Sequence, residues 1–159
     1  MFLRDYQKED WAAICDIFIR AKPDELKGSC SPEAVIPLAK DEVLLKSFNH
    51  SILYVAELEH QVVGYGGYQD SLVSFLFVDP DYYKRGIATL LLKKVILQIG
   101  AKAWLNVAKN NIPARELYQK FGFKIAEEFM GKYNGHVVTV FRLACPFLQF
   151  PSLRVCSTS

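Results

Sequence analysis

The sequence predicts one α/β domain built around a mixed α+β sheet. Apolar residues recur with helical spacing before residue 50 and in two later segments, whereas runs rich in β-branched and aromatic residues fill most of the chain from 52 to 143. The 159 residues, 51% hydrophobic and 23% charged, are enough for a single core that buries about 70% of the unfolded surface. No internal repeat and no linker divides the chain, so we expect one domain over residues 1–143, followed by a tail at 144–159.

The first third of the chain is predicted to be helical. A helix from about residue 9 to 20 is indicated by apolar residues that share one helical face, namely Trp11, Ile14, Cys15, Phe18 and Ile19. The region from 21 to 50 is expected to be helical in pieces. Ser31-Pro32-Glu33 is typical of a cap and first turn, and Pro37 interrupts the helical pattern soon after it.

The middle of the chain changes to a β pattern. "ILYVAELEHQVVGYGGY" predicts two strands joined through Glu59-His60-Gln61, and "LVSFLFV" predicts a third. Residues 86–99 keep their polar side chains on a restricted side, which predicts a largely buried helix that ends at Gly100.

The last third adds a strand, a helix and a hairpin. "KAWLNV" predicts a short strand, and "NNIPARELYQKFGF" predicts a helix with an Asn cap, Pro113 in its first turn and a stop at Gly122. Two further strands are expected around Asn134-Gly135, a strong hairpin signal. The tail at 144–159 receives no functional assignment.

Charge and cysteine content exclude several classes of protein. The net charge of +2 and pI near 8.3, without a clustered basic face, argue against a nucleic-acid or membrane partner. The cysteines contain no C-x-x-C pair, so no metal site is predicted and we expect reduced thiols at Cys15, Cys30, Cys145 and Cys156. The N-terminus does not read as a secretory leader, and no run reaches the ~18 apolar residues of a membrane span. These features predict a soluble, cytoplasmic protein.

One stretch, "FLFVDPDYYKRGIATLLL", predicts an anion site. A strand that ends in a tight turn at a helix N-terminus gathers unpaired N–H groups and the positive end of the helix dipole. Gly86 and the small Ala88 would let an anion approach the backbone, and Lys84 and Arg85 add positive charge. On local sequence alone, an ordinary connection with a solvated basic pair is an equal alternative.

Other phosphate-binding motifs are absent from the sequence. Gly131-Lys132 is followed by Tyr133, which excludes a P-loop, and "GYGGYQ" has Gln69 where a dinucleotide fingerprint needs a third Gly.

Two segments in succession give the anion site a family context. "VDPDYYKRGIATLLL" and "LNVAKNNIPARELYQKFGF" resemble the two signature motifs of the GCN5-related N-acetyltransferase superfamily, and the element order is similar over residues 2–143. The first motif, roughly Q/R-x-x-G-x-G/A, corresponds to residues 83–88, and the second places its Asn at Asn111 and its Tyr at Tyr118. Tyr83 stands where the family usually has Gln or Arg, and Lys84 where it often has Gly.

The resemblance implies a central, mostly antiparallel sheet with helices on both faces, and acetyl-CoA as co-substrate without a metal. It implies that backbone amides of the first motif bind the pyrophosphate and that Tyr118 acts near the thioester. The amine acceptor is not identified, and a homodimer is compatible with the sequence. The cofactor-binding residues that it implies are Leu76, Phe77, Val78, Tyr83, Lys84, Arg85, Gly86, Ile87, Ala88, Thr89, Asn111 and Tyr118.

Acetyl transfer to an amine requires a neutral amine and a proton for the departing thiolate. A thiol has a pKa of about 8.5 and a phenol one of about 10, so a tyrosine held beside the thioester can donate that proton. Tyr118 is the predicted donor, although its place on an apolar helix face also suits a core tyrosine.

The base is left open by the sequence. Asp70, Glu57, His136 and a water chain are alternatives. Asn106 stands where relatives that acetylate ribosomal proteins carry a Glu, and it cannot accept a proton near neutral pH. The acids of "KPDEL" and "KDE" either attract a cationic amine or are solvated.

Three functions therefore remain open at the level of sequence. The paired motifs favour an acetyl-CoA-dependent N-acetyltransferase that acts on a primary amine of a small molecule, peptide or protein. Asn106 and the unassigned base favour a non-catalytic acyl-CoA-binding regulatory module. A helix-presenting interaction domain without a cofactor would leave the spacing from Gly86 to Tyr118 to coincidence.

Overall fold

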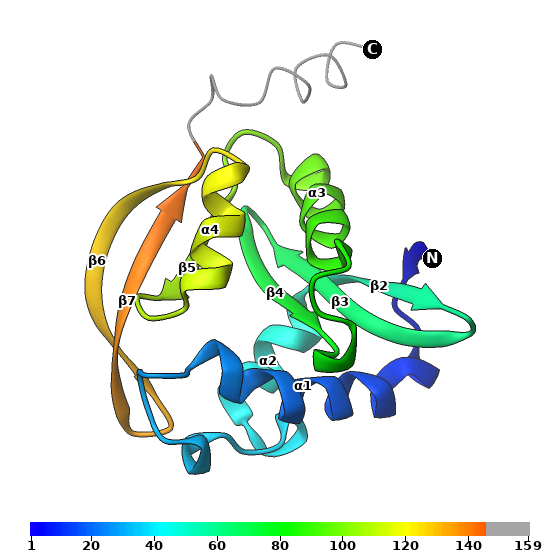
Figure 1. Cartoon of the computed structure of the whole chain (residues 1–159), viewed down its shortest axis with the longest axis horizontal. Helices are drawn as coiled ribbons and strands as arrows, with labels where there is room; N and C mark the ends of the chain where they lie inside the picture. The colour runs from blue at the N-terminus through cyan, green and yellow to red at the C-terminus, as the bar shows by residue number, and fades with distance from the viewer. Residues whose placement is uncertain (146–159) are drawn as a thin grey trace.

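A single seven-stranded sheet forms the centre of the molecule (Figure 1). The structure is a computed structural model that describes residues 1–145; residues 146–159, which include most of the predicted tail and Cys156, lie outside the described residues. The strand order is β1-β2-β3-β4-β5-β7-β6, and all neighbouring pairs are antiparallel except β4 with β5. The strands are β1 (Phe2–Asp5), β2 (Ile52–Leu58), β3 (Gln61–Gln69), β4 (Leu72–Val78), β5 (Trp104–Ala108), β6 (Lys124–Tyr133) and β7 (His136–Ala144).

Helices cover both faces of this sheet, as predicted. They are α1 (Trp11–Glu25), α2 (Glu42–His50), α3 (Ile87–Ile99) and α4 (Ile112–Lys120). On one face, α3 and α4 pack against Ala56, Val63 and Leu105. On the other, α1 and α2 pack against Val55 and Tyr65. Because side chains alternate along a strand, neighbouring residues such as Val55 and Ala56 enter opposite cores, and the two cores hold the sheet between layers of helices.

Both predicted hairpins are confirmed. The turn between β2 and β3 consists of Glu59 and His60, and the turn between β6 and β7 of Asn134 and Gly135. All four residues have positive φ, which two-residue turns need to match the twist of the strands that they join.

Two predictions at the N-terminus were wrong. The predicted element order lacked β1, a four-residue edge strand that pairs Leu3 with Ala56 of β2. The first helix was expected to end near residue 20, but α1 continues through Pro23 to Glu25. Its last turn buries Ala21 and Lys22, and this packing compensates for the hydrogen bond that proline cannot donate.

The connection from α1 to β2 is helical in pieces, as expected. Short 3₁₀ turns occupy Pro32–Ala34 and Leu38–Lys40, and α2 comes next. Asp41 caps α2 by accepting a hydrogen bond from the backbone N–H of Leu44 at 3.1 Å.

Candidate functional site

The sheet opens between β4 and β5. This parallel pair contains one register pair, Leu72 with Trp104, supported by a 3.0 Å bond from the Trp104 N–H to the Ser71 carbonyl. The remaining length of both strands, including Leu76 and Asn106, lines a cavity of about 460 Å³. The interruption of the sheet therefore gives access to backbone groups that would be paired in a continuous sheet.

The N-terminus of α3 borders the same cavity. Gly86 takes the left-handed conformation with φ of 80°, and Lys84 two residues earlier has φ of 62°. A Cβ at Gly86 would meet no protein atom within 4 Å, so the space in front of this backbone is open. The first N–H groups of a helix have no partner within the helix, and this geometry fits the predicted anion site.

An ion pair fixes the turn between β4 and α3. The Asp79 carboxylate accepts a hydrogen bond of 2.8 Å from each terminal nitrogen of Arg20 on α1. Its Oδ1 also accepts a 2.9 Å hydrogen bond from the Asp81 N–H. The hydrogen bonds from Arg20 lower the pKa of Asp79. Helix α1 is thereby held to the turn at residues 79–86, which contains the predicted anion site and is called the anion loop below.

The residues that the sequence nominated for cofactor binding are brought together here. All of them line the cavity except Arg85, whose guanidinium lies over the Tyr82 ring at 4.9 Å. Their roles in binding stay predictions. Asn111 lies at the start of α4, where its side-chain oxygen accepts the Ala114 N–H at 3.4 Å, so a ligand contact from this side chain would come from Nδ2.

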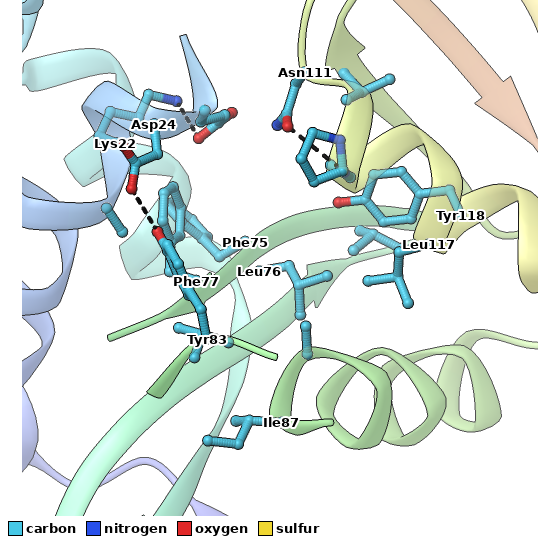
Figure 2. Close-up of a pocket in the computed structure, with 18 of the residues that line it drawn as sticks. Lys22, Asp24, Phe75, Leu76, Phe77, Tyr83, Ile87, Asn111, Leu117 and Tyr118 are labelled. Atoms are coloured by element: carbon cyan, nitrogen blue, oxygen red, sulfur yellow. Dashed lines mark hydrogen bonds and ion pairs between the residues drawn. The ribbon is translucent and has the colours of Figure 1, made fainter. Parts of the chain in front are cut away.

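Tyr83 reaches across the cavity toward α1. Its hydroxyl donates a 3.1 Å hydrogen bond to Asp24 (Figure 2). Burial and the neighbouring charge of Asp24 raise the pKa of Tyr83 well above the ordinary range. This tyrosine, which departs from the family motif, joins the anion loop to the end of α1.

The Tyr118 hydroxyl points into the cavity from α4 (Figure 2). The side chain is 8% exposed, and its ring packs edge-on against Phe123 with 6.0 Å between ring centroids. Burial, and to a lesser extent the negative charge of Glu25, raises the pKa of Tyr118 above its usual value. Tyr118 is therefore a protonated phenol near neutral pH, which is the form that can donate a proton.

The three side chains that the sequence nominated as bases lie elsewhere. Glu57 accepts a hydrogen bond from Arg4 at the β1–β2 edge, Asp70 is exposed in the turn before β4, and His136 is exposed at the start of β7. None of them is among the described residues that line the cavity. Asn106 does line it, and its side-chain oxygen accepts a 3.4 Å bond from Arg142.

Lys22 was not singled out from the sequence, and Glu25 was considered only as one of the acids of "KPDEL". They lie on the last turn of α1 and line the cavity, with 3.0 Å between the Lys22 Nζ and the Glu25 carboxylate. These acids were expected either to attract a cationic amine or to be solvated, and ending the predicted helix near residue 20 hid their position. Extending the helical pattern through Pro23 was the signal that could have placed them on the cavity wall.

Comparisons with known proteins agree with this geometry. Residues 49–125 match the family model described as an acetyltransferase (GNAT) domain. The chain is 32% identical over 128 residues to the uncharacterized N-acetyltransferase YafP of Escherichia coli, an alignment that covers 79% of this chain and 83% of that protein. A segment of 68 residues, 42% of this chain and 9% of the relative, is 43% identical to the human cysteine-rich protein 2-binding protein.

Solved structures share the fold. A GCN5-related N-acetyltransferase from Rhodopseudomonas palustris superposes with a TM-score of 0.78 at 22% identity, covering 89% of this chain and 92% of that one. The structure of yncA from Salmonella typhimurium, which contains its cofactor acetyl-CoA, gives a TM-score of 0.70 at 17% identity, with 92% and 94% covered.

Two further structural findings concern the described residues 1–145. None of their helices is both long and apolar enough to cross a membrane. They contain no group of three or more His, Cys, Asp or Glu side chains arranged to hold a metal ion, and Cys15 and Cys30 are free thiols.

Proposed function

The chain belongs to the GCN5-related N-acetyltransferase superfamily, and we propose that it transfers the acetyl group of acetyl-CoA to a primary amine. One observation carries this proposal. A single cavity extends from the open N-terminus of α3 at Gly86 to the Tyr118 hydroxyl. Between these ends it follows the part of β4 that does not pair with β5. The predicted anion site and the proposed proton donor thus border one cavity between two strands.

The chemistry of the cavity wall supports one direction for the bound cofactor. The pyrophosphate requires N–H donors and positive charge, which the turn at Lys84 and Gly86 supplies. The pantetheine arm carries amides, which suit the backbone groups of β4 beside Leu76. The thioester then lies near Tyr118, at the far end of the cavity from the phosphates.

The proposed reaction is a direct transfer. The lone pair of a neutral amine attacks the thioester carbon, a C–N bond forms, and the C–S bond breaks with its electrons on sulfur. Tyr118 donates its proton to the departing thiolate and is reprotonated from solvent, while the amine nitrogen loses one proton. A thiol has a pKa of about 8.5, whereas the pKa of Tyr118 lies above 10. Proton transfer from Tyr118 to the thiolate is therefore uphill, and rapid reprotonation of the resulting phenolate from solvent completes the step.

The amine is proposed to enter from the side of α1. Two carboxylates there, Asp24 and Glu25, line the cavity together with one cation, Lys22, so this wall carries a net negative charge. Such a wall favours a cationic amine over an anionic acceptor. Small-molecule and peptide amines both satisfy this condition.

A second function is favoured by a specific observation. Of the three β5 residues that line the cavity, the polar one is Asn106, and the three nominated bases lie outside the cavity. A module that binds acyl-CoA without transferring the acyl group would need no base. The two functions differ in whether bound acetyl-CoA is consumed.

Calorimetry with acetyl-CoA, followed by a thiol-release assay over a panel of amines and peptides, tests the proposal. We expect saturable binding and thiol release that at least one primary amine stimulates. Binding with no stimulation by any amine would establish the binding module instead, and absence of binding would exclude both functions.

A further inference from the structure

A primary amine of the protein itself lies in the proposed acceptor region. Of the described residues that line the cavity, two are lysines, Lys22 and Lys84. Lys84 is exposed beside the N-terminus of α3, where the pyrophosphate is proposed to bind. Lys22 comes from the last turn of α1, and its side chain is 10% exposed.

The surroundings of Lys22 resemble a binding site for an alkylammonium group. Its Nζ lies 6.0 Å from the centre of the Phe18 ring, 5.6 Å from that of Phe77 and 5.0 Å from that of Tyr133. The Glu25 carboxylate is 3.0 Å away. Aromatic faces and a carboxylate hold a cationic nitrogen together and limit its movement.

This amine and the proposed proton donor lie on opposite sides of one cavity. In Figure 2, Lys22 extends from α1 and the Tyr118 hydroxyl points inward from α4 on the other side of the cavity, which Phe77 and Leu76 of β4 also line. Acyl transfer needs the nucleophile to approach one face of the planar thioester, and a proton donor within reach of the sulfur that departs. A thioester bound between β4 and β5 would meet this arrangement without any external acceptor.

We propose that Lys22 is a self-acetylation site, modified by acetyl-CoA bound in the same chain. The inference rests on the proposed function, because it requires acetyl-CoA in the cavity. It adds a substrate for which the rest of the site needs no partner molecule.

The step balances within the site. One proton of the Lys22 ammonium passes to solvent, and the neutral Nζ attacks the thioester carbon. A C–N bond forms, the C–S bond breaks, Tyr118 protonates the thiolate, and the second proton lost by nitrogen passes to solvent. Well-oriented intramolecular nucleophiles reach effective molarities of ~10⁵ M or more, so a restrained lysine can react faster than a freely diffusing one.

Acetylation would change the charge of the acceptor wall. The product is a neutral amide, so Glu25 would lose its cationic partner and its carboxylate would become available to another ammonium group. The modified wall would hold two carboxylates, Asp24 and Glu25, without the compensating lysine.

Incubation of the full chain with acetyl-CoA, without any added amine, tests this proposal. Intact-mass measurement counts the acetyl groups, and peptide mapping locates them. Lys27 serves as the internal control, because it is exposed just beyond the same helix and reports uncatalysed acetylation. We expect Lys22 to be acetylated at least tenfold faster than Lys27, with a rate per chain that does not depend on protein concentration.

Two variants sharpen the result. Lys22→Arg keeps a cation beside Glu25 but removes the reactive amine, so the dominant modification should disappear while Lys27 labelling persists. Tyr118→Phe should slow Lys22 acetylation about 100-fold and leave Lys27 unaffected. Melting curves of both variants establish that they are folded.

The outcomes separate this inference from the proposed function. Acetyl-CoA binding by calorimetry with Lys22 unmodified, or modified no faster than Lys27, overturns self-acetylation and leaves the acetyltransferase function standing. A rate that rises with protein concentration overturns modification within one chain. Absence of acetyl-CoA binding overturns both proposals.

Discussion

Replacement of Tyr118 by phenylalanine isolates the proposed proton donor. The substitution removes one oxygen and keeps the ring, which packs edge-on against Phe123 and is 8% exposed. Among the described residues no hydrogen bond from the Tyr118 hydroxyl is formed, since its oxygen points into the cavity. The variant therefore retains the packing of the side chain and loses no internal bond.

The magnitude of each effect can be derived from this geometry. General acid catalysis contributes about 10²- to 10⁴-fold, and we expect the lower end because a thiolate is already a tolerable leaving group near neutral pH. A 100-fold loss corresponds to about 2.7 kcal/mol of transition-state stabilisation. With no hydrogen bond removed, the free energy of unfolding should change by less than about 1 kcal/mol. The acetyl-CoA dissociation constant should stay nearly the same.

Three measurements on one preparation make the test. Thiol release gives turnover with an accepted amine, calorimetry gives the acetyl-CoA dissociation constant, and thermal melting gives stability. Turnover equal to that of the wild type would refute the assignment of Tyr118 as the acid. A loss of binding in parallel with turnover would show that the hydroxyl contributes to affinity rather than to proton transfer.

Other perturbations test the anion loop and its support. Gly86→Glu should abolish acetyl-CoA binding in calorimetry because it places a carboxylate at the pyrophosphate, and normal binding would exclude this turn as the phosphate site. The substitution should cost about 1–2 kcal/mol of stability because φ of 80° is strained for a residue with a Cβ, but the domain should stay folded because that Cβ meets no protein atom within 4 Å. Lys84→Gly should raise stability by up to about 1 kcal/mol in urea denaturation, since φ of 62° is strained for lysine, and weaken acetyl-CoA binding modestly by removing a charge; unchanged stability would contradict the strain. Arg20 holds the pKa of Asp79 below that of the unfolded chain, so this pair stabilises the fold above about pH 4 and the contribution is lost as pH falls further. Asp79→Asn should therefore lower stability at pH 7 by about 1–3 kcal/mol and flatten the decline below pH 4, and an unaltered pH profile would count against the ion pair.

The fold was largely predictable where local chemistry determines it. Asn134-Gly135 specified its hairpin because both turn residues accept positive φ, and Asn111 with Pro113 marked the start of α4. The strand β1 was missed because four residues at a sheet edge carry too short a pattern to detect. Its pairing with β2 joins residues 49 to 55 positions apart, which no local window contains.

Some residues of the candidate site could likewise be predicted from local sequence, and others were missed. Residues 83–89 and Tyr118 lie on contiguous motifs, so they could be nominated from the sequence. Lys22 and Glu25 were missed because the predicted helix stopped short of them, and their place on the cavity wall also depends on how α1 approaches β4. The end of α1 was misjudged because proline usually terminates a helix, and here the burial of Lys22 and its neighbours outweighs that tendency.

The single register pair between β4 and β5 also divides the sheet into two parts that are each contiguous in sequence. Strands β1 to β4 form one part and β5 to β7 the other. Cooperativity is lowest where few bonds cross, so sub-global opening along this seam should need less free energy than global unfolding, and amide protons beside it should exchange before those of the hairpins. A ligand that touches both parts would close the seam, and the protection it confers on those amides would report occupancy residue by residue.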